Sequence, residues 1–332
     1  MEKKIHTVLG PISPEELGFT QCHEHLLLSK GESYRQNPAL WMDDVESSIK
    51  EAKVYRERGG SALVEAQPVG CNRVSQGLEE ISGRTGVHIV ASTGFHKRLF
   101  YPKGHWIGNT DRARLARLFA EELTQGMYVG TEQVPPFESE TLAGQTGAKT
   151  KVYRTGARAG IIKTALDVYG LEGGYRELFF AAAAAQKETD APMMVHIEPG
   201  SSPMELVSFL ETEGVDLGRV YFCHMDRACG DWEIFRQVLG CGVSLEFDTI
   251  GRFAYHSDEK ELELIMQVLA ENEDQLLLSL DTTRARLKSY CEDGVGLAYI
   301  LEVFLPMMRQ KGISEKQLSK IFLENPGRIL AW

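Results

Sequence analysis

Residues 18–28 read GFTQCHEHLLL, and this stretch decides the fold because later parts of the chain repeat its pattern. A strand-like run at residues 18–20 leads into it. Side chains alternate along a strand, so His23 and His25 point to one face, while Cys22 and Glu24 are outward-facing neighbours on the other. Two imidazoles on one face can reach a single divalent metal ion. An isolated pair of this kind also occurs in ordinary loops, so its meaning depends on what later strands supply.

Seven more apolar runs of strand length follow, at residues 62–66, 87–92, 159–163, 193–197, 220–224, 242–248 and 276–281. Helical segments alternate with them. Near-continuous apolar strands that alternate with helices are typical of a parallel sheet covered on both sides. We therefore expect an α/β fold, a (β/α)₈ TIM barrel, with residues 1–332 forming one domain. An open doubly wound sheet is the alternative, but it predicts a glycine-rich phosphate loop after the first strand, and the sequence has none there.

Two segments fall outside the repeating pattern. Residues 128–158 contain Pro135-Pro136 and several glycines and threonines, and they predict an insertion before strand 4, formed as a hairpin with a role in scaffolding or assembly. At the other end, two helices at about 296–310 and 314–324 close the chain, so the barrel carries an extra C-terminal helix.

The composition excludes several classes of protein. The net charge of −11 argues against a nucleic-acid partner and against an anionic membrane surface. No apolar run approaches the roughly 18 residues of a membrane helix, and the N-terminus lacks the apolar segment of a secretory signal. The six cysteines have no CxxC spacing, which suits reduced thiols. We expect a soluble, cytoplasmic protein that binds a small molecule.

Polar side chains stand at the ends of the predicted strands. They come from strands one, four, five, six and eight: His23, His25, Lys163, His196, His224 and Asp281. A parallel barrel gathers the carboxyl ends of its strands on one rim, where barrel active sites lie. A single buried histidine is more often hydrogen-bonded in a core, but five coincident donors make that explanation poor. Four imidazoles and a carboxylate predict a divalent metal site, with zinc favoured and manganese as the alternative.

Lys163 is the unusual member of this set, because a protonated amine is repelled by a metal ion. Two interpretations stay open. Either the side chain faces away from the rim, or its amine has reacted with carbon dioxide to give a carbamate, an anion whose two oxygens can bridge two metals.

Several motifs together resemble the phosphotriesterase family of the amidohydrolase superfamily, in particular its lactonase branch. They occur in order along nearly the whole chain: Gly10-Pro11-Ile12, the stretch from Gly18 to His25, Ala159-Gly160-Ile161-Ile162-Lys163, His224-Met225-Asp226 and Asn325-Pro326-Gly327-Arg328. The resemblance implies a binuclear centre and a homodimer. It places His23, His25 and Asp281 on a buried metal and His196 and His224 on an outer one, with N6-carboxylated Lys163 and a hydroxide bridging both.

The chemistry expected of such a centre is hydrolysis. Two metals lower the pKa of a shared water and polarise the oxygen of the electrophile. Asp281, bound to a metal and next to the hydroxide, is the candidate proton shuttle. This machinery serves a phosphate triester, a carboxylic ester or a lactone, so the bond that is cleaved must be inferred from the loops.

The rim loops carry an excess of basic residues for an acidic protein. The candidate substrate-binding residues follow strands three, six and eight: Lys97, Arg98, Tyr101, Arg227, Arg284, Arg286 and Lys288. Surface ion pairing is the ordinary role of such residues, but arginines also suit bidentate capture of phosphate. We therefore expect a substrate with a phosphate monoester away from the reacting bond.

These inferences predict a metal-dependent hydrolase that opens a lactone ring, with a phosphorylated sugar-acid (furanose) lactone as first choice. A phosphotriesterase or carboxylesterase on neutral substrates, or an acyl-homoserine lactonase, is the alternative. A non-catalytic metal-binding barrel is disfavoured, because a metal site without a catalytic role would not need the proton shuttle Asp281. Residues 31–42 and 94–110 are the expected contacts of the homodimer.

Overall fold

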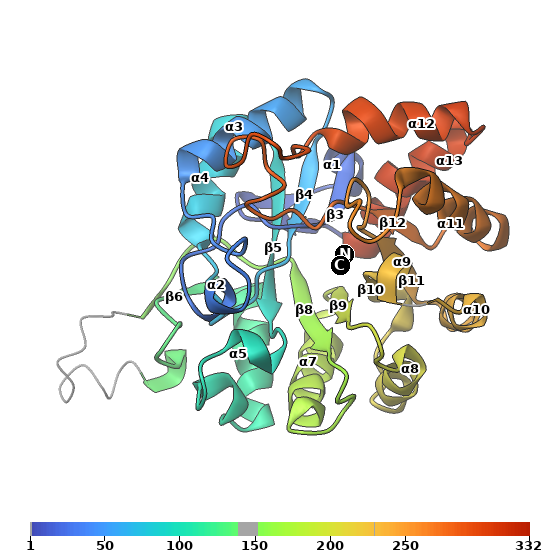
Figure 1. Cartoon of the computed structure of the whole chain (residues 1–332). Coiled ribbons are helices and arrows are strands. Elements are labelled where there is room, and N and C mark those ends of the chain that lie inside the picture. The colour runs from blue at the N-terminus through green and yellow to red at the C-terminus, as the bar shows by residue number, and fades with distance from the viewer. Residues whose placement is uncertain (1, 139–151, 229) are drawn as a thin grey trace.

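Eight parallel strands form one sheet in the computed structural model, which describes residues 2–138, 152–228 and 230–332. Their order across the sheet is β12-β11-β10-β9-β8-β5-β4-β3, so each strand lies beside its predecessor among the barrel strands. The bounds are β3 Thr20–Glu24, β4 Ala62–Glu65, β5 His88–Gly94, β8 Ile161–Leu166, β9 Met193–Ile197, β10 Val220–Cys223, β11 Ser244–Phe247 and β12 Leu276–Leu278. Helices surround the sheet (Figure 1), and the predicted (β/α)₈ barrel is confirmed.

The helices follow the strands in sequence and cover the outside of the sheet. The longer ones are α3 Val45–Glu57, α4 Ser75–Thr85, α5 Arg112–Thr124, α7 Tyr175–Thr189, α8 Pro203–Thr212, α10 Trp232–Gly240 and α11 Asp258–Glu271. The shorter ones are α1 Pro14–Leu17, α2 Glu32–Gln36, α9 Met225–Ala228, α12 Leu305–Gln310, α13 Glu315–Ser319 and α14 Asn325–Leu330. Among the described residues, no helix has the length and apolar character needed to cross a membrane.

A small second core fills the inside of the barrel. It joins inward residues of the strands, such as Val64, Ile161 and Tyr221, to Ile329 and Leu330 of α14. The N-terminal hairpin, β1 Ile5–Thr7 with β2 Gly10–Ile12, belongs to the same end. The two termini meet there through paired backbone hydrogen bonds between Lys4 and Trp332. The second core and the paired termini close the amino-terminal end of the barrel. A polar site is therefore expected at the opposite, carboxyl-terminal rim.

The first and last strands are joined through the side chain of Glu24. Its carboxylate accepts the Leu280 N–H at 2.8 Å and the Thr282 N–H at 3.1 Å. The backbone adds one bond, from the Asp281 N–H to the His23 carbonyl at 3.0 Å. Glu24, predicted as an outward-facing neighbour of the two histidines, is fully buried in this seam. In a closed barrel, the second face of a strand is covered by other elements.

Some strand bounds differ from the sequence-based expectation. The first strand covers Thr20–Glu24 instead of 18–20, because Gly18 has φ +66° and breaks the extended backbone before it. The last strand ends at Leu278, so Asp281 lies in the loop three residues beyond it. The expected hairpin before strand four is present as the antiparallel pair β6 Tyr128–Val129 and β7 Tyr153–Arg154. Residues 139–151 of that insertion lie outside the described residues.

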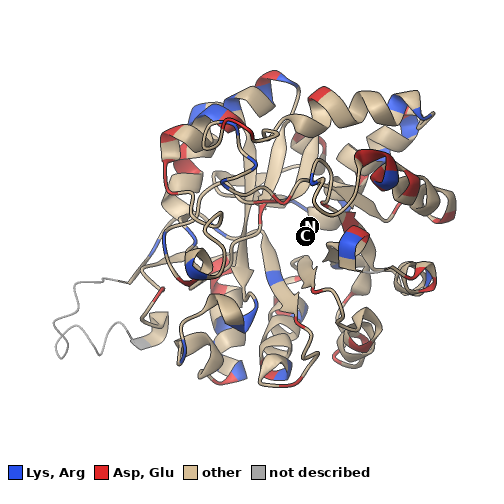
Figure 2. Ribbon diagram, in the orientation of Figure 1, with Lys and Arg blue, Asp and Glu red and all other residues tan. Residues whose placement is uncertain are grey.

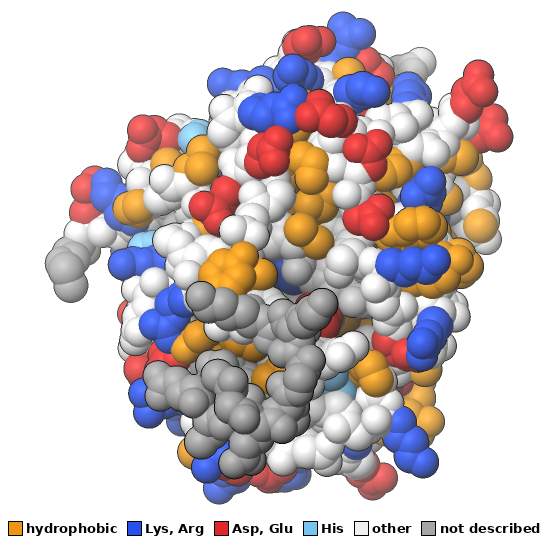
Figure 3. Space-filling model, turned by 90° about the vertical axis from the view of Figure 1, so that its left-hand side faces the viewer, with side chains coloured by type: hydrophobic (Ala, Val, Ile, Leu, Met, Phe, Trp, Pro, Cys, Tyr) orange, Lys and Arg blue, Asp and Glu red, His pale blue; other side chains and the backbone are white. Residues whose placement is uncertain are grey.

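Charged residues lie mainly on the outer helices and loops (Figure 2), where acidic and basic positions alternate. In Figure 3, acidic and basic side chains are interspersed over the described part of one face, together with small apolar patches.

Candidate metal centre

Three of the predicted ligands converge at the carboxyl end of the barrel. The Oδ1 atom of Asp281 lies 3.7 Å from Nε2 of His23 and 3.5 Å from Nε2 of His25. Zinc–nitrogen and zinc–oxygen bonds are ~2 Å long, so ligand atoms around one ion lie roughly 3–4 Å apart. All three side chains are buried, and their ligand atoms form a group that could hold a metal ion.

Carboxylates lie next to the Nδ1 atoms of the histidine rings. Nδ1 of His23 lies 3.2 Å from Asp248, and Nδ1 of His25 lies 3.4 Å from Glu65. Nδ1 of His224 lies 2.5 Å from the same Asp248. A carboxylate at Nδ1 fixes the ring and leaves Nε2 free for a metal, as is usual for metal-binding histidines. Sequence reasoning missed Asp248 and Glu65. Asp248 ends the predicted strand 242–248 and so offered the same strand-end signal as the other ligands, whereas Glu65 lies within its strand and offered none.

Lys163 faces the centre, which excludes the interpretation that it points away. Its Nζ atom lies 3.5 Å from Nε2 of His23 and 3.3 Å from the sulfur of Met194, and the side chain is fully buried. Burial lowers the pKa of the Lys163 amine. A neutral amine is the nucleophile that reacts with carbon dioxide, so this environment suits carbamate formation.

His196 lies beside this group, but its ring has its Nε2 atom, and not Nδ1, next to a carboxylate. Its ring centroid is 4.4 Å from that of His224, but its Nε2 atom lies 2.7 Å from Glu198. The Nζ atom of Lys97 lies 2.7 Å from the same carboxylate oxygen. Lys97, predicted to bind substrate, therefore lies at the edge of the centre. Because Nε2 of His196 contacts Glu198, Nδ1 is the nitrogen of His196 that remains available to bind a metal.

The backbone at the rim adopts uncommon conformations. His224 and Asp281 have φ values of +65° and +49°, a region that non-glycine residues seldom occupy. Residues held in this way cluster at functional sites, where the surrounding structure maintains them. Gly94, with φ +97°, ends β5 beside Lys163: a Cβ atom there would lie 2.0 Å from the Lys163 carbonyl oxygen. Only glycine lets these two strands approach so closely.

Two arginines hold the other oxygen of Asp281. Oδ2 lies 3.0 Å from Arg227 and 3.0 Å from Arg252. Burial alone would raise the pKa of Asp281, but Arg252, His25, His23 and Arg227 together hold that pKa well below its ordinary value. Arg227 was predicted to lie at this rim, whereas Arg252 was missed. The available signal was the position of Arg252, four residues after the predicted strand 242–248 in an acidic protein.

The three predicted cations after strand eight do not reach the centre. Arg286 is buried and donates to the carbonyls of Leu280 and Ile250, so it supports the loop from within. Burial, together with the nearby Arg252, lowers the pKa of Arg286 to about 10. Arg284 lies over the rings of Trp41 and Tyr290, and Lys288 is exposed. Sequence position brought these residues near the rim but did not fix where their side chains point.

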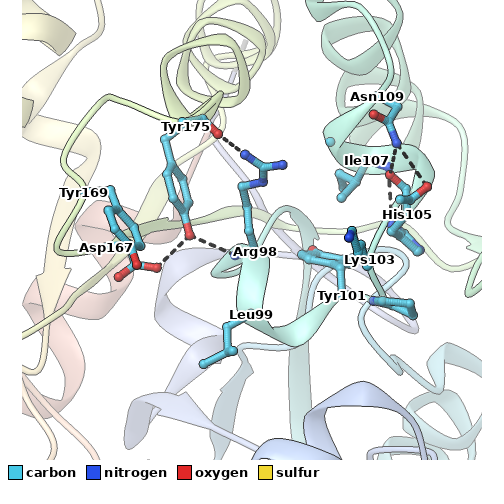
Figure 4. Close-up of a pocket in the computed structure, with 14 residues that line it drawn as sticks. Arg98, Leu99, Tyr101, Lys103, His105, Ile107, Asn109, Asp167, Tyr169 and Tyr175 are labelled. Carbon is cyan, nitrogen blue, oxygen red and sulfur yellow. Dashed lines mark hydrogen bonds between the residues drawn. The ribbon is translucent and has the colours of Figure 1, made fainter.

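A separate pocket of about 460 Å³ opens between the loops after β5 and β8. Figure 4 shows Arg98 and Tyr101, both predicted to bind substrate, among its lining residues. The Tyr175 hydroxyl accepts the Arg98 N–H and donates to Asp167, each at 2.8 Å. None of the candidate metal ligands lines this pocket, but the Tyr101 hydroxyl accepts the N–H of His96, whose ring lies 5.4 Å from His196. The pocket thus adjoins the centre.

The geometry defines a class of protein. A (β/α)₈ barrel whose carboxyl-terminal rim holds buried histidines, a carboxylate and a buried lysine has the donor set of a divalent metal centre.

The comparisons place the chain within that class. It belongs to the phosphotriesterase family, whose sequence profile matches residues 3–133 and 147–330, and the resemblance seen in the sequence is confirmed. A phospho-furanose lactonase of Mycoplasmopsis synoviae (strain 53) is 28% identical over 343 residues, covering 100% of this chain and 93% of that protein. An N-acetyltaurine hydrolase of Danio rerio is 27% identical over 373 residues, covering 99% and 98%. A solved lactonase structure from Listeria monocytogenes has a TM-score of 0.84 at 28% identity, with 98% of each chain covered.

Proposed function

We propose that this chain is a metal-dependent hydrolase that opens a lactone ring. The observation that carries the proposal is the buried group of His23, His25 and Asp281, with Lys163 and His224 beside it, at the catalytic rim of a phosphotriesterase-family barrel. Lactonases among the relatives and among the similar structures support the choice of ester chemistry.

The proposed centre holds two divalent ions, with zinc favoured and manganese as the alternative. His23, His25 and Asp281 would hold the inner ion, His196 and His224 the outer ion, and carboxylated Lys163 would bridge them. The carboxylate-backed imidazoles and the buried amine of Lys163 fit this set. Two bound ions would supply acidity to a shared water and would polarise the ester carbonyl.

The chain's own residues divide the remaining work. Asp281 presents Oδ1 to the imidazoles, while Arg227 and Arg252 fix Oδ2. Asp281 is the proposed proton shuttle, and the arginines set its orientation and keep it anionic until a proton arrives. The side chain of Arg252 is 17% exposed, so it can also reach a substrate at the mouth of the centre.

The proposed substrate is a phosphorylated furanose lactone. The matched phospho-furanose lactonase supports it, and so does the placement of Lys97 and the partly exposed Arg252 around the centre, where each can also contact an anionic group of the substrate. A second candidate is hydrolysis of an N-acyl amino-sulfonate amide, favoured by the near full-length match to an N-acetyltaurine hydrolase. Both substrates carry an anionic group away from the bond that breaks.

A substrate screen tests the proposal. Metal-loaded protein is mixed with furanose lactones, with and without a phosphate, and acid release is followed by pH change. N-acetyltaurine is tested separately by release of its primary amine, because at neutral pH that amine takes up the proton of the acid formed. The expected result is fast turnover of a phosphorylated lactone, lost in Asp281→Asn. Turnover of the amide alone would favour the second candidate. Undiminished lactone hydrolysis by Asp281→Asn would eliminate the proposed proton shuttle.

We also propose a cytoplasmic homodimer. Cys22, Cys71, Cys223, Cys241 and Cys291 form no disulfide in the described chain, which supports this location. An open apolar hollow between the 31–42 segment and the loop after β12, lined by Pro38, Trp41 and Tyr290, supports a contact there. Light scattering on wild type and Trp41→Ala tests the assembly, since a monomeric wild type would contradict it.

A further inference from the structure

A second group of potential metal ligands lies behind the catalytic rim. It combines Asp226 of α9, His256 of the loop after β11 and Glu261 of α11, and one ligand atom of each lies within 4.8 Å of the others. Figure 1 shows α9 and α11 on the side of the barrel where β10 and β11 lie. The three other candidate groups all contain His23, whereas this one shares no residue with them. It is therefore a separate cluster.

The carboxylates of this cluster are buried with free oxygens. Glu261 has no exposed surface, and neither of its oxygens has a hydrogen-bond partner among residues 2–138, 152–228 and 230–332. Asp226 is 6% exposed; its Oδ2 atom accepts the N–H groups of Asp248 and Thr249, but Oδ1 has no such partner within the described chain. An ionised carboxylate is seldom buried without a proton, a donor or a cation to compensate it.

His256 places its Nε2 atom beside these oxygens. Its Nδ1 atom lies 3.2 Å from the carbonyl of Ser257, and a carbonyl only accepts hydrogen bonds, so Nδ1 carries the proton. In the neutral ring, Nε2 is then an unprotonated nitrogen. It lies 3.2 Å from Oε2 of Glu261. Two electron pairs at this distance repel each other unless a positive charge lies between them.

Other groups around the cluster do not supply enough positive charge. Asp258 is bound to the Gly251 N–H and the Tyr299 hydroxyl, and Asp248 is held by His224. Arg227 is the nearby cation, but its guanidinium is shared between Asp248 and Asp281. Burial, with the added repulsion of Asp226, Asp248 and Asp258, raises the pKa of Glu261 well above its ordinary value. The cluster is therefore short of positive charge.

We propose that Asp226, His256 and Glu261 form a binding site for one divalent cation, distinct from the binuclear centre. One imidazole nitrogen and two or more carboxylate oxygens suit Zn²⁺ or Mn²⁺. The 3.2 Å separation between His256 and Glu261 is close to the ligand–ligand spacing around such an ion. The cation would be structural. It ties α9, which follows His224 directly, to the loop that carries Arg252 and to α11.

Metal stoichiometry tests the site. Full-length protein is stripped with a chelator, equilibrated with Zn²⁺ or Mn²⁺, freed of loose metal, and measured by plasma mass spectrometry. The expected result is one metal per chain fewer in Glu261→Gln than in wild type. Glu263→Gln is the matched control, because Glu263 lies on the same helix, is exposed, and pairs only with Lys260 among the described residues. His256→Ala is a second variant that removes the nitrogen donor and should lose the same equivalent.

The count also separates this site from the catalytic one. A His23→Ala/His25→Ala variant should lose metal from the binuclear centre and keep the additional equivalent, which Glu261→Gln then removes. Equal metal content in wild type, Glu261→Gln and His256→Ala would overturn the proposal, whatever the catalytic centre holds. In that case a protonated His256 paired with Glu261 is the compensating charge. If Glu261→Gln does not fold, the comparison of His256→Ala with wild type decides between these outcomes.

Discussion

Glu24→Gln removes the charge from the side chain that joins the first and last strands of the barrel. The substitution keeps the size of the side chain, so it changes hydrogen bonding and leaves the packing volume nearly unaltered. Glu24 is fully buried, and its neighbours across the seam are the backbone of Leu280 and both the backbone and hydroxyl of Thr282. The expected effect is a loss of stability without a change of fold.

The size of the loss follows from the donors that the carboxylate serves. Oε1 accepts the Leu280 N–H at 2.8 Å, and Oε2 accepts the Thr282 N–H at 3.1 Å and its hydroxyl at 2.7 Å. Glutamine has one oxygen, so when that oxygen serves Thr282 its NH₂ group meets the Leu280 N–H, donor against donor. An unsatisfied buried donor costs ~1–3 kcal/mol, and the remaining bonds lose their charge assistance. The expected total is about 3 kcal/mol.

Chemical denaturation is the suitable assay, because the thermal shift is small for a chain of this length. At ~2.1 cal/mol/K per residue, 3 kcal/mol lowers the Tm of 332 residues by only ~4 °C. Wild type and Glu24→Gln are unfolded in urea after chelation, so that metal binding does not contribute. The control is Glu57→Gln on the exposed face of α3, expected to lie within ~0.5 kcal/mol of wild type. If Glu24→Gln is equally close to wild type, the carboxylate does not hold the seam.

Three further outcomes are expected. Arg252→Ala should lower kcat/KM for a phosphorylated lactone ~10–100-fold more than for its unphosphorylated form, since a charge-assisted contact contributes ~1.5–3 kcal/mol. The control is Arg236→Ala at an exposed position. An unchanged rate ratio would show that Arg252 does not bind phosphate. Lys163→Ala should lower the metal content per chain, and added propionate should restore part of it if the lysine acts as a carbamate; no response to a carboxylate would argue against that form. Burial lowers the pKa of His105 to about 4, so the stability that depends on its neutral ring is present above pH ~6.5 and is lost as the pH falls toward 4. After discounting for partial solvation, the free energy of unfolding of His105→Gln should fall by about 2 kcal/mol less than that of wild type over this range. Identical pH profiles would refute this.

The barrel and most of its rim could be predicted because both depend on periodic signals. Apolar runs separated by helices indicate parallel strands, and a polar residue at the end of such a run reaches the rim whatever its rotamer. His23, His224 and Lys163 were placed together on that ground, and the structure brings them together. Asp281 lies beyond its strand but is still within reach, because the turn after β12 is short.

The supporting residues could not be predicted, because they depend on side-chain direction and on partners far away in sequence. Glu24 alternates with the histidines, which identifies its face of the strand but not the backbone of residues 280–282 that covers it. Arg286 and Arg252 are both loop arginines near the rim. One turns inward to carbonyls and the other outward to Asp281, and no local pattern distinguishes them. Asp248 serves two histidines from different strands, a relation visible only in three dimensions.

The seam at Glu24 also has a consequence for biosynthesis. β3 and β12 are separated by about 250 residues of chain, so the barrel stays an open sheet with two unpaired edges until its last strand emerges. His23 and His25 arrive with the first strand, whereas Asp281 arrives after the last. A nascent chain therefore passes through a stage with half a coordination shell and exposed strand edges, when chaperones and the timing of metal supply matter most. Metal capture should follow ring closure, so an assembled centre indicates that the barrel has closed.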